Sequence, residues 1–464
     1  MTTEPGPNVV DLGDLHRVEY ARVLAAVAAS TRDLELAEES VQEAFAAALR
    51  TWPVRGVPER PGAWLTTVAR RRAIDVVRRE GRRARLEREA TEDPGDPHSG
   101  AGGSGDPRSG AGEGTDHDRL RLSFLTCHPS FSATTRVAMT LRFVFGLRTR
   151  EIARLLAMSE SAVHKQIQRA RGKVRDARIP LRFPAPERVA ERLPSVLDCL
   201  RLVFTEGYAA TSGDDLIRSD LCRDAIALTR AAVRSFPEHA ATRALLALEL
   251  LQDARRDTRV DVDGAIVLLE DQDRARWDRS AITEALDLLD GLGPLRDVAG
   301  TAPDGDGRAS VADPSTRSLV HQAAIAAVHA RAESFDVTDW AAMLDHYDAL
   351  LALTGSDVVA LNRVVVVHRV RGASVALEDL DRIDPARVGR VHLLHAVRAD
   401  LLEACGDLDG ARRELDAAIA AAGTAPERAL LEERRRGSWR EQPVAPVSTF
   451  VAGDASPGGA PGRH

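Results

Sequence analysis

The amino-acid sequence predicts an all-α protein built from several domains. Its 464 residues are 44% hydrophobic and 29% charged, a balance typical of a folded chain with apolar cores. Alanine and leucine recur at spacings of three and four, whereas the alternating β-branched residues that indicate strands are scarce. At roughly 150 residues per domain, the length corresponds to about three domains.

Neither a membrane segment nor a cysteine-based site is expected. No uncharged apolar stretch approaches the ~18 residues that span a bilayer, and the opening MTTEPGPNVVDLGD lacks the pattern of a signal peptide, so we expect a cytoplasmic protein. The sequence predicts no metal site and no cofactor. The cysteines form no C-x-x-C pair, and we expect them to be reduced and to serve packing: Cys127, Cys199, Cys222 and Cys405.

The net charge of −7 is distributed very unevenly along the chain. Residues 1–89 are nearly neutral and residues 90–118 carry a net charge of −6. Residues 119–178 contain thirteen Lys and Arg against three acidic residues, a net charge of +10. The remainder, 179–464, is acidic at −12. A compact basic block in an acidic chain is typical of a segment that binds nucleic acid.

Composition divides the chain into five parts. The second of them is a predicted flexible linker, because 14 of its 29 residues are Gly, Pro or Ser. The last is expected to be disordered. The predicted parts are a first helical domain at 12–89, the linker at 90–118, a second helical domain at 119–178, a helical repeat domain at 186–436 and a tail at 437–464.

An acidic amphipathic helix is predicted over residues 33–45. Its apolar positions share one stripe, and its other faces carry five carboxylates without a basic residue. Such a face is either simply solvated or a docking surface for a basic partner, since unbalanced carboxylates repel one another. The stripe consists of Leu34, Ala37, Val41 and Phe45, and the carboxylates are Asp33, Glu35, Glu38, Glu39 and Glu43.

A strongly basic helix follows in the segment RPGAWLTTVARRRAIDVVRRE. Pro61 lies near its start, where a missing N–H does no harm. Nine arginines lie between Trp64 and Arg88, and Asp75 can neutralise some of them within the helix but not all. We therefore expect an exposed basic face. The buried stripe is predicted to contain Leu65, Val68, Ala69, Ala73 and Val76.

A helix-turn-helix is predicted in the basic block. Thr149 is expected to cap its first helix, whose core face is Ile152, Leu155 and Leu156, and Ser159 its second. The second helix would bury Val163, Ile167, Ala170 and Val174. Polar residues at the start of such a helix read base edges while cations hold phosphates, although His164 could also be a plain surface residue. The outward face carries Ser161, His164, Lys165, Gln168, Arg169, Arg171, Lys173 and Arg175.

The long C-terminal part reads as paired antiparallel helices. In ACGDLDGARRELDAAIAAAG, Gly406 permits a tight turn and small residues with Leu415 form a close-packed seam. Pro237 separates a second pair of Ala/Leu-rich helices. The pattern predicts an α-solenoid of tetratricopeptide type, and the Gly/Pro/Asp-rich stretch 291–315 could divide it in two.

These segments together carry a family resemblance. AEESVQEAF, AWLTTVARRRAIDVVRR and GLRTREIARLLAMSESAVHKQIQRARGK resemble, in this order, regions 2 and 4 of extracytoplasmic-function (ECF) sigma factors of the sigma-70 class. CHP at 127–129, EGYAAT, DQDRARWDR, AAIAAVHA, TDW and the Asn362-Arg363 pair resemble the subfamily with a fused tetratricopeptide-like domain. STRSLVHQ departs from the expected Gly-Pro-Tyr start of its motif.

The resemblance implies a sigma factor that is not an enzyme, with core RNA polymerase and promoter DNA as partners. The acidic helix would dock on core polymerase, the basic helix would open the minus-ten element and the helix-turn-helix would read the minus-thirty-five element. The C-terminal domain would modulate activity, for instance through contact with the sigma domains. The implied residues are Asp33, Glu38, Glu39, Gln42 and Phe45 for polymerase, Trp64, Arg71, Arg72, Arg78 and Arg79 for minus ten, and Ser161, His164, Lys165, Gln168, Arg169, Arg171 and Lys173 for minus thirty-five.

Two other classes of function stay open at this point. An operator-binding regulator would also use a helix-turn-helix, but it would leave the acidic helix and the separate arginine-rich helix unexplained. An enzyme would need acid/base or metal groups, which the C-terminal part offers without any catalytic motif. Helix capping and ion pairing explain the same groups: Asp271, Asp273, Arg274, Trp277, Asp278, Arg279, His321, His329, His392 and His395.

Overall fold

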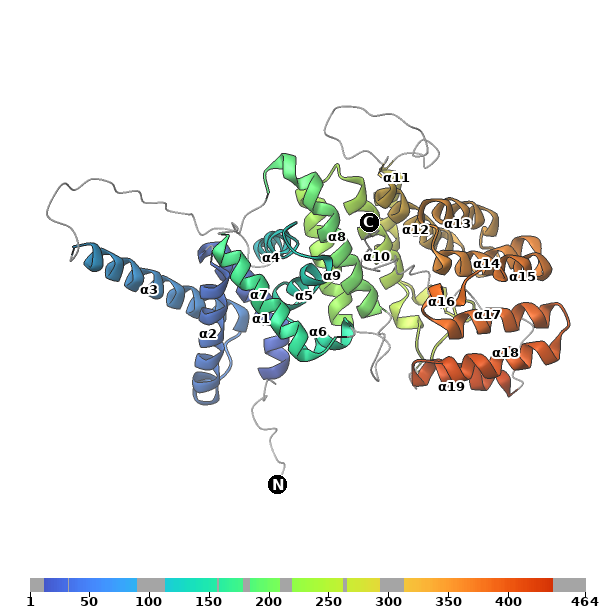
Figure 1. Cartoon of the computed structure of the whole chain (residues 1–464), viewed down its shortest axis with the longest axis horizontal. Coiled ribbons are helices and arrows are strands. Elements are labelled where there is room, and N and C mark those ends of the chain that lie inside the picture. The colour runs from blue at the N-terminus through green and yellow to red at the C-terminus, as the bar shows by residue number, and fades with distance from the viewer. Residues whose placement is uncertain are drawn as a thin grey trace, which may run out of the picture. The chain divides into compact units, whose positions relative to one another are not determined.

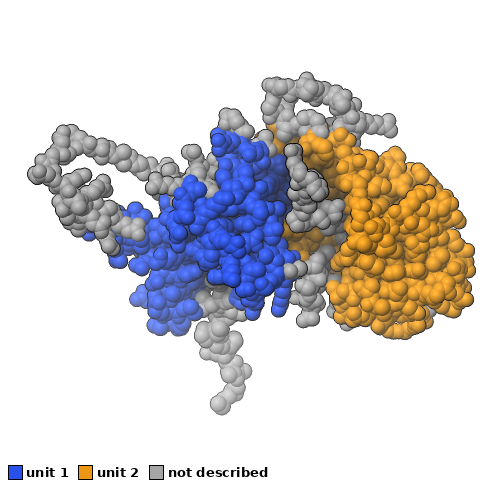
Figure 2. Space-filling model, viewed as in Figure 1, with its two compact units in different colours: residues 1–199 blue, residues 200–464 orange. Residues whose placement is uncertain are grey.

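The structure is a computed structural model that describes residues 12–31, 33–89, 113–156, 158–177, 184–208, 219–261, 265–292 and 313–436. The chain divides into two compact units, residues 1–199 and 200–464 (Figure 2). Apart from an isolated β-bridge between Val260 and Ile266, the regular structure in the described residues is helical, which confirms the predicted fold class. Residues 90–112 of the predicted linker, most of the stretch 291–315 and the tail 437–464 lie outside the described residues.

Unit 1 begins with three mutually packed helices, α1 (Leu12–Thr31), α2 (Leu34–Arg55) and α3 (Pro61–Glu89). The Asp33 carboxylate starts α2 by accepting hydrogen bonds from the backbone N–H groups of Glu35 and Leu36 at 2.9 and 3.0 Å. Gly56, at a φ of 79°, ends it. The predicted apolar stripe of α2 is buried, as are Leu65, Ala69 and Ala73 of α3.

The second part of unit 1 contains α4 (Glu113–Thr126), α5 (Ala133–Phe143), α6 (Thr149–Leu155) and α7 (Glu160–Asp176). Helices α6 and α7 form the predicted helix-turn-helix, and α4 packs on both α5 and α1. Helix α4 begins at Glu113, inside the range that the sequence assigned to the linker; ion pairs such as Asp116 with Arg119 at 3.6 Å support this turn. Helix α8 (Pro186–Tyr208) follows and runs to the end of unit 1 and beyond.

The capping prediction holds for one of the two helices. Ser159 caps α7, since its hydroxyl accepts a hydrogen bond from the Ala162 N–H at 3.2 Å. Thr149 does not cap α6 but is its first residue, and Arg148 takes the N-cap position. The reason is the Glu151 carboxylate, which accepts the Arg148 backbone N–H at 2.8 Å and so moves the helix start back by one residue.

Unit 2 is a succession of helices in which neighbours along the chain pack together (Figure 1). Pro237 separates α9 from α10, and Gly406, at a φ of 86°, forms the turn between α17 and α18, as predicted. Ala411, Leu415 and Ala418 are buried in that seam. The elements are α9 (Ser219–Ser235), α10 (Ala240–Asp253), η1 (Arg256–Thr258), η2 (Arg274–Arg276), α11 (Arg279–Asp290), α12 (Pro314–Arg331), α13 (Trp340–Thr354), α14 (Asp357–Arg371), α15 (Ala373–Leu380), α16 (Pro385–Val388), α17 (Val391–Ala404), α18 (Leu408–Ala421) and α19 (Ala425–Arg435).

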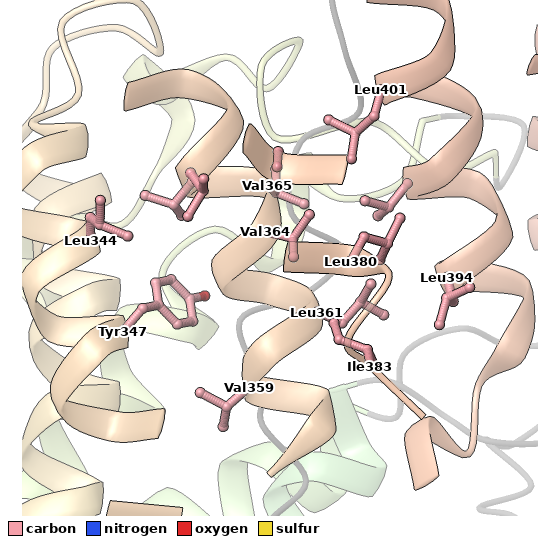
Figure 3. Close-up of a cluster of buried hydrophobic side chains, with 14 of the residues drawn as sticks. Leu344, Tyr347, Val359, Leu361, Val364, Val365, Leu380, Ile383, Leu394 and Leu401 are labelled. Atoms are coloured by element: carbon pink, nitrogen blue, oxygen red, sulfur yellow. The ribbon is translucent and has the colours of Figure 1, made fainter. Parts of the chain in front are cut away.

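The core of unit 2 is aliphatic, with one tyrosine prominent in it. Figure 3 shows Tyr347 of α13 among Leu344 and the valines of α14, including Val359 and Val364. A smaller cluster around Leu415 joins α17, α18 and α19. Because burying each large aliphatic side chain contributes about 1.5–3 kcal/mol, the two clusters hold the successive helices together.

None of the helices in the described residues is long and apolar enough to cross a membrane. Three of the four cysteines are buried and Cys405 is exposed, so the predicted packing role fails at that position. The thiols of Cys127 and Cys199 lie 3.6 Å apart within unit 1.

Candidate nucleic-acid interface

The outward face of α7 is the predicted reading surface. Ser161, His164, Lys165 and Gln168 are exposed along the first half of the helix, while Val163, Ile167 and Ala170 are buried beneath them. This arrangement follows directly from the helical period. The face therefore presents polar side chains at the positive end of a helix dipole, next to further exposed cations at Arg169, Lys173 and Arg175.

The C-terminal half of α7 faces the acidic helix α2 within unit 1. Arg171 Nη2 lies 3.1 Å from Glu38 Oε2, and Arg175 Nη1 lies 3.2 Å from Glu35 Oε2. Arg171 is only half-exposed as a result. A residue predicted to hold DNA phosphate and a residue predicted to bind polymerase thus pair with each other.

Glu38 is the centre of this contact. The residue is only 5% exposed, far from the solvated position that an acidic helix face suggests. The Tyr20 hydroxyl donates to Glu38 Oε1 at 3.2 Å, and Arg142 Nη2 lies 3.4 Å from the same oxygen. The Arg142 guanidinium also stacks over the Tyr20 ring at 5.3 Å. Burial, with the carboxylate beside it, raises the pKa of Tyr20, so its hydroxyl stays protonated and donates.

The other predicted polymerase-binding residues of α2 are split between surface and core. Asp33, Glu39 and Gln42 are exposed. Phe45 is buried with its ring 6.4 Å from that of Tyr20, and its predicted contact with polymerase stays a prediction. Its role is to fix α2 against α1.

The basic helix α3 presents the predicted minus-ten residues. Arg71, Arg78 and Arg79 are exposed, and Arg72 is half-exposed. Trp64 is half-buried against Trp52, with ring centroids 5.4 Å apart. Arg71 and Arg78 share one face of the helix, two turns apart.

Sequence reasoning missed two apolar residues on α3. Ile74 and Val77 remain 50% and 51% exposed, although each lies between arginines in the sequence. Neither fits the buried stripe. Ile74 shares the face of Arg71 and Arg78 at helical spacing, so this face combines cations with an exposed aliphatic side chain.

Two arginines counted in the basic segments serve the fold instead. Arg119 is fully buried, and its Nε and Nη2 donate to the Val144 carbonyl at 3.1 and 3.0 Å. Arg70 donates to the Ala26 carbonyl at 3.3 Å. The arginine counts of the two basic segments therefore overstate the charge available to DNA.

Several of the groups that suggested an enzyme in unit 2 take part in local structure. Asp273 and Asp278 accept backbone N–H groups at the starts of η2 and α11. His395 contacts Glu414 at 2.6 Å, and His392 lies 3.6 Å from Glu427. The described residues contain no group of His, Cys, Asp and Glu arranged to hold a metal ion.

The helices that carry these surfaces match the models of known protein families. The family model described as sigma-70 region 2 matches residues 15–83, and that of sigma-70 region 4 matches residues 121–174. These ranges contain α2 and α3 on one side and the helix-turn-helix on the other. A third model, a family of unknown function (DUF6596), matches residues 192–292. The molecule is therefore a sigma-70-type protein.

The relatives define the family further. An uncharacterised protein of Rhizobium meliloti (strain 1021) is 40% identical over 403 residues, which cover 86% of this chain and 89% of the relative. A Mycobacterium tuberculosis protein described as "Probable ECF RNA polymerase sigma factor SigI" is 32% identical over 161 residues, 34% of this chain and 53% of that protein. No solved structure matches the chain. The chain belongs to the ECF sigma-70 family and carries an additional helical C-terminal region.

Proposed function

We propose that this chain is an RNA polymerase sigma factor that binds the core enzyme, recognises promoter DNA in two places and starts transcription. The observation that carries the proposal is the face of α7: polar residues at a capped helix start and cations behind them, inside the region 4 match. The arginine-rich face of α3 supplies the second contact, inside the region 2 match. The protein is expected to work in the cytoplasm and to perform no chemistry itself.

Reconstituted transcription tests this proposal. Core polymerase, the purified full chain and a genomic promoter library are incubated, and RNA 5′ ends are sequenced. Transcripts that start at defined sites only when the chain is present are expected. The competing function, an operator-binding regulator, predicts DNA binding without association with core polymerase, and a pull-down of the core enzyme separates the two.

We further propose that α7 divides its residues between base edges and phosphates. Gln168→Ala is expected to change base preference at one promoter position by about 1–3 kcal/mol, because a lost bidentate contact discriminates against particular bases. Arg169→Ala, a matched control one residue away, should weaken binding to all sequences and lower the salt slope by about one. Binding to promoter variants at several salt concentrations is the measurement. Identical behaviour of the two variants would refute this orientation of α7.

The predicted modulation of activity by the C-terminal region is a proposal that a truncation experiment can test. The helices that match region 4 also contact α8 within unit 1. Arg136 Nη1 donates to Ser195 Oγ at 2.8 Å, and Cys127 contacts Cys199. A chain that ends after Tyr208 keeps these contacts, whereas one cut at residue 180 would lose them. Reconstituted transcription with the shortened and full chains is compared, and equal activity would exclude control by the removed helices.

A further inference from the structure

Unit 2 contains a group of buried polar side chains that promoter recognition does not use. The buried arginine cluster consists of Arg255, Arg274, His329 and Tyr347, with exposed fractions of 8%, 7%, 3% and 0%. Arg255 follows α10, Arg274 begins η2, His329 lies near the end of α12 and Tyr347 lies on α13. Helix α12 packs against both α10 and α13, so four separate segments contribute to the cluster.

The two arginines of the cluster have neutral partners. Arg255 Nη2 donates to the Tyr208 hydroxyl at 2.6 Å and to Gln252 Oε1 at 3.0 Å. Arg274 Nη1 donates to the carbonyls of His329 and Ala332 at 2.6 and 2.8 Å. Within the described part of the chain, neither guanidinium has a carboxylate at ion-pair distance. Buried guanidinium groups are ordinarily paired with an anion, because the desolvation of an uncompensated charge costs several kcal/mol.

Several polar atoms of the cluster are also without a hydrogen-bond partner in the described structure. They are Arg274 Nη2, both ring nitrogens of His329 and the Tyr347 hydroxyl. Figure 3 shows the Tyr347 ring among aliphatic side chains, which offer its hydroxyl no hydrogen-bond partner. A buried polar atom of this kind can be satisfied by a ligand, an ion or a water molecule.

The electrostatics of the cluster show that its members act on one another. Burial, reinforced by the charges of Arg255 and Arg274, lowers the pKa of His329 to about 3. Burial, with Arg255 and Arg279 nearby, lowers the pKa of Arg274 to about 10. Arg255 also opposes the upward pKa shift of Tyr347 caused by burial. At neutral pH, His329 is thus an uncharged imidazole that can donate one hydrogen bond.

We infer that the buried arginine cluster is a binding site for a small oxyanion, the carboxylate or phosphate group of a metabolite. Guanidinium forks match the planar or tetrahedral oxygens of such groups, and the hydroxyl and imidazole N–H supply further donors. An anion bound beside the two guanidinium groups would compensate charges that have no carboxylate partner in the described structure. Two sequence motifs that lie outside the sigma domains meet at this site. They are DQDRARWDR, which contains Arg274, and AAIAAVHA, which contains His329.

A purely structural role is the alternative, since Arg274 already ties η2 to the end of α12. Tyr347→Phe separates the two explanations. The variant keeps the ring in its apolar surroundings and removes a hydroxyl that has no partner, so without a ligand it should be at least as stable as the parent. If the hydroxyl binds the anion, Tyr347→Phe should in contrast be less stable than the parent only when the anion is present.

The test uses the full-length protein and two probes, inorganic phosphate and succinate, with sodium chloride at matched ionic strength. Calorimetric titration and thermal unfolding are measured for the parent, Tyr347→Phe, Arg255→Lys and the control Arg234→Gln, which changes an exposed arginine of α9. We expect saturable binding of at least one probe and a rise in melting temperature beyond the chloride control. Affinity should fall about tenfold in both cluster variants and stay unchanged in Arg234→Gln.

The pattern of outcomes decides the inference. Preference for phosphate over succinate, or the reverse, identifies which oxyanion chemistry the site takes, and either supports the proposal. Failure of both probes to stabilise the parent beyond chloride overturns it. So does binding that Tyr347→Phe and Arg255→Lys leave intact, or a loss of stability in Tyr347→Phe without any ligand. A failure of promoter-dependent transcription would not bear on these binding measurements, which keeps the two proposals separate.

Discussion

Helix α7 of unit 1 and the buried arginine cluster of unit 2 treat charged side chains in opposite ways. In unit 1, the arginines of α7 lie at the surface or pair with carboxylates of a neighbouring helix, as Arg171 does with Glu38. In unit 2, Arg255, Arg274 and the carboxylate of Glu249 are buried without an opposite charge at ion-pair distance in the described structure. Surface charges can exchange partners at little cost, whereas buried ones are held by the fold. Exposed arginines such as those of α7 can contact a partner as large as DNA. Buried groups such as Arg255 and Arg274 can contact only a small, enclosed ligand, and a buried carboxylate such as Glu249 can be held in one protonation state.

The largest expected effect concerns the buried Glu249 of α10. Burial, with Asp253 nearby and despite Arg230, raises the pKa of Glu249 to about 8 from its ordinary value of 4.5. Between these values the folded chain keeps a proton that the unfolded chain has released. Stability should therefore fall as the pH rises through this window. Glu249→Gln should remove that loss, gaining roughly 2–4 kcal/mol relative to the parent between pH 5 and pH 8.5.

Hydrogen exchange of the α10 amides measures this change, because it reports local stability in a protein of several domains. Glu238→Gln, at an exposed carboxylate in the same unit, is the control and should show the same pH dependence as the parent. A parent protein whose α10 protection is flat from pH 5 to pH 8.5 would show that Glu249 is not held protonated.

The next effect concerns Glu38, the corresponding carboxylate of unit 1. Glu38→Gln removes the negative charge that Arg142 and Arg171 share, and we expect a cost of about 1–3 kcal/mol in the protection of α2. Glu43→Gln, which changes the exposed pair of Glu43 with Arg50 at 3.7 Å, should cost less than about 1 kcal/mol. Equal effects of the two variants would contradict the central position given to Glu38.

The smallest effect tests whether exposed charge pairs in unit 2 behave like those of unit 1. Arg230 and Glu284 join α9 to α11 through two hydrogen bonds of 3.0 and 2.8 Å, yet both side chains are more than one third exposed. Arg230→Gln is expected to cost between about 0.2 and 1 kcal/mol in thermal or denaturant unfolding. A loss above that of Glu38→Gln would mean that exposure does not separate the two classes of pair.

The sequence predicted most of what depends on local periodicity. The outward face of α7, its Ser159 cap and the seam around Leu415 follow from residue spacing alone, because a helix repeats every 3.6 residues. Family motifs in the right order predicted the two sigma regions. The start of α6 was off by one residue because Glu151 accepts the Arg148 N–H, a competition between caps that spacing does not resolve.

What depends on contacts distant in the sequence was not predictable. Glu38 read as one carboxylate on a solvated face, and nothing near it in the sequence indicates that Tyr20, Arg142 and Arg171 surround it. Arg119 was counted as free positive charge although the Val144 carbonyl holds it in the core. Arg274 was weighed as a structural or catalytic residue, but its closeness to Arg255 and His329 exists only in the folded unit 2.

The Glu38–Arg171 contact is expected to lower the affinity of the free protein for promoter DNA. A side chain engaged with a carboxylate is not available to a phosphate, so only molecules in which that contact is broken are competent to use Arg171. The apparent dissociation constant is the intrinsic one divided by the competent fraction: if one molecule in a hundred is open, binding weakens about 100-fold. If α2 docks on polymerase as the resemblance implies, the α2 carboxylates would be drawn away from Arg171, and DNA binding by Arg171 would be favoured only in the complex with polymerase.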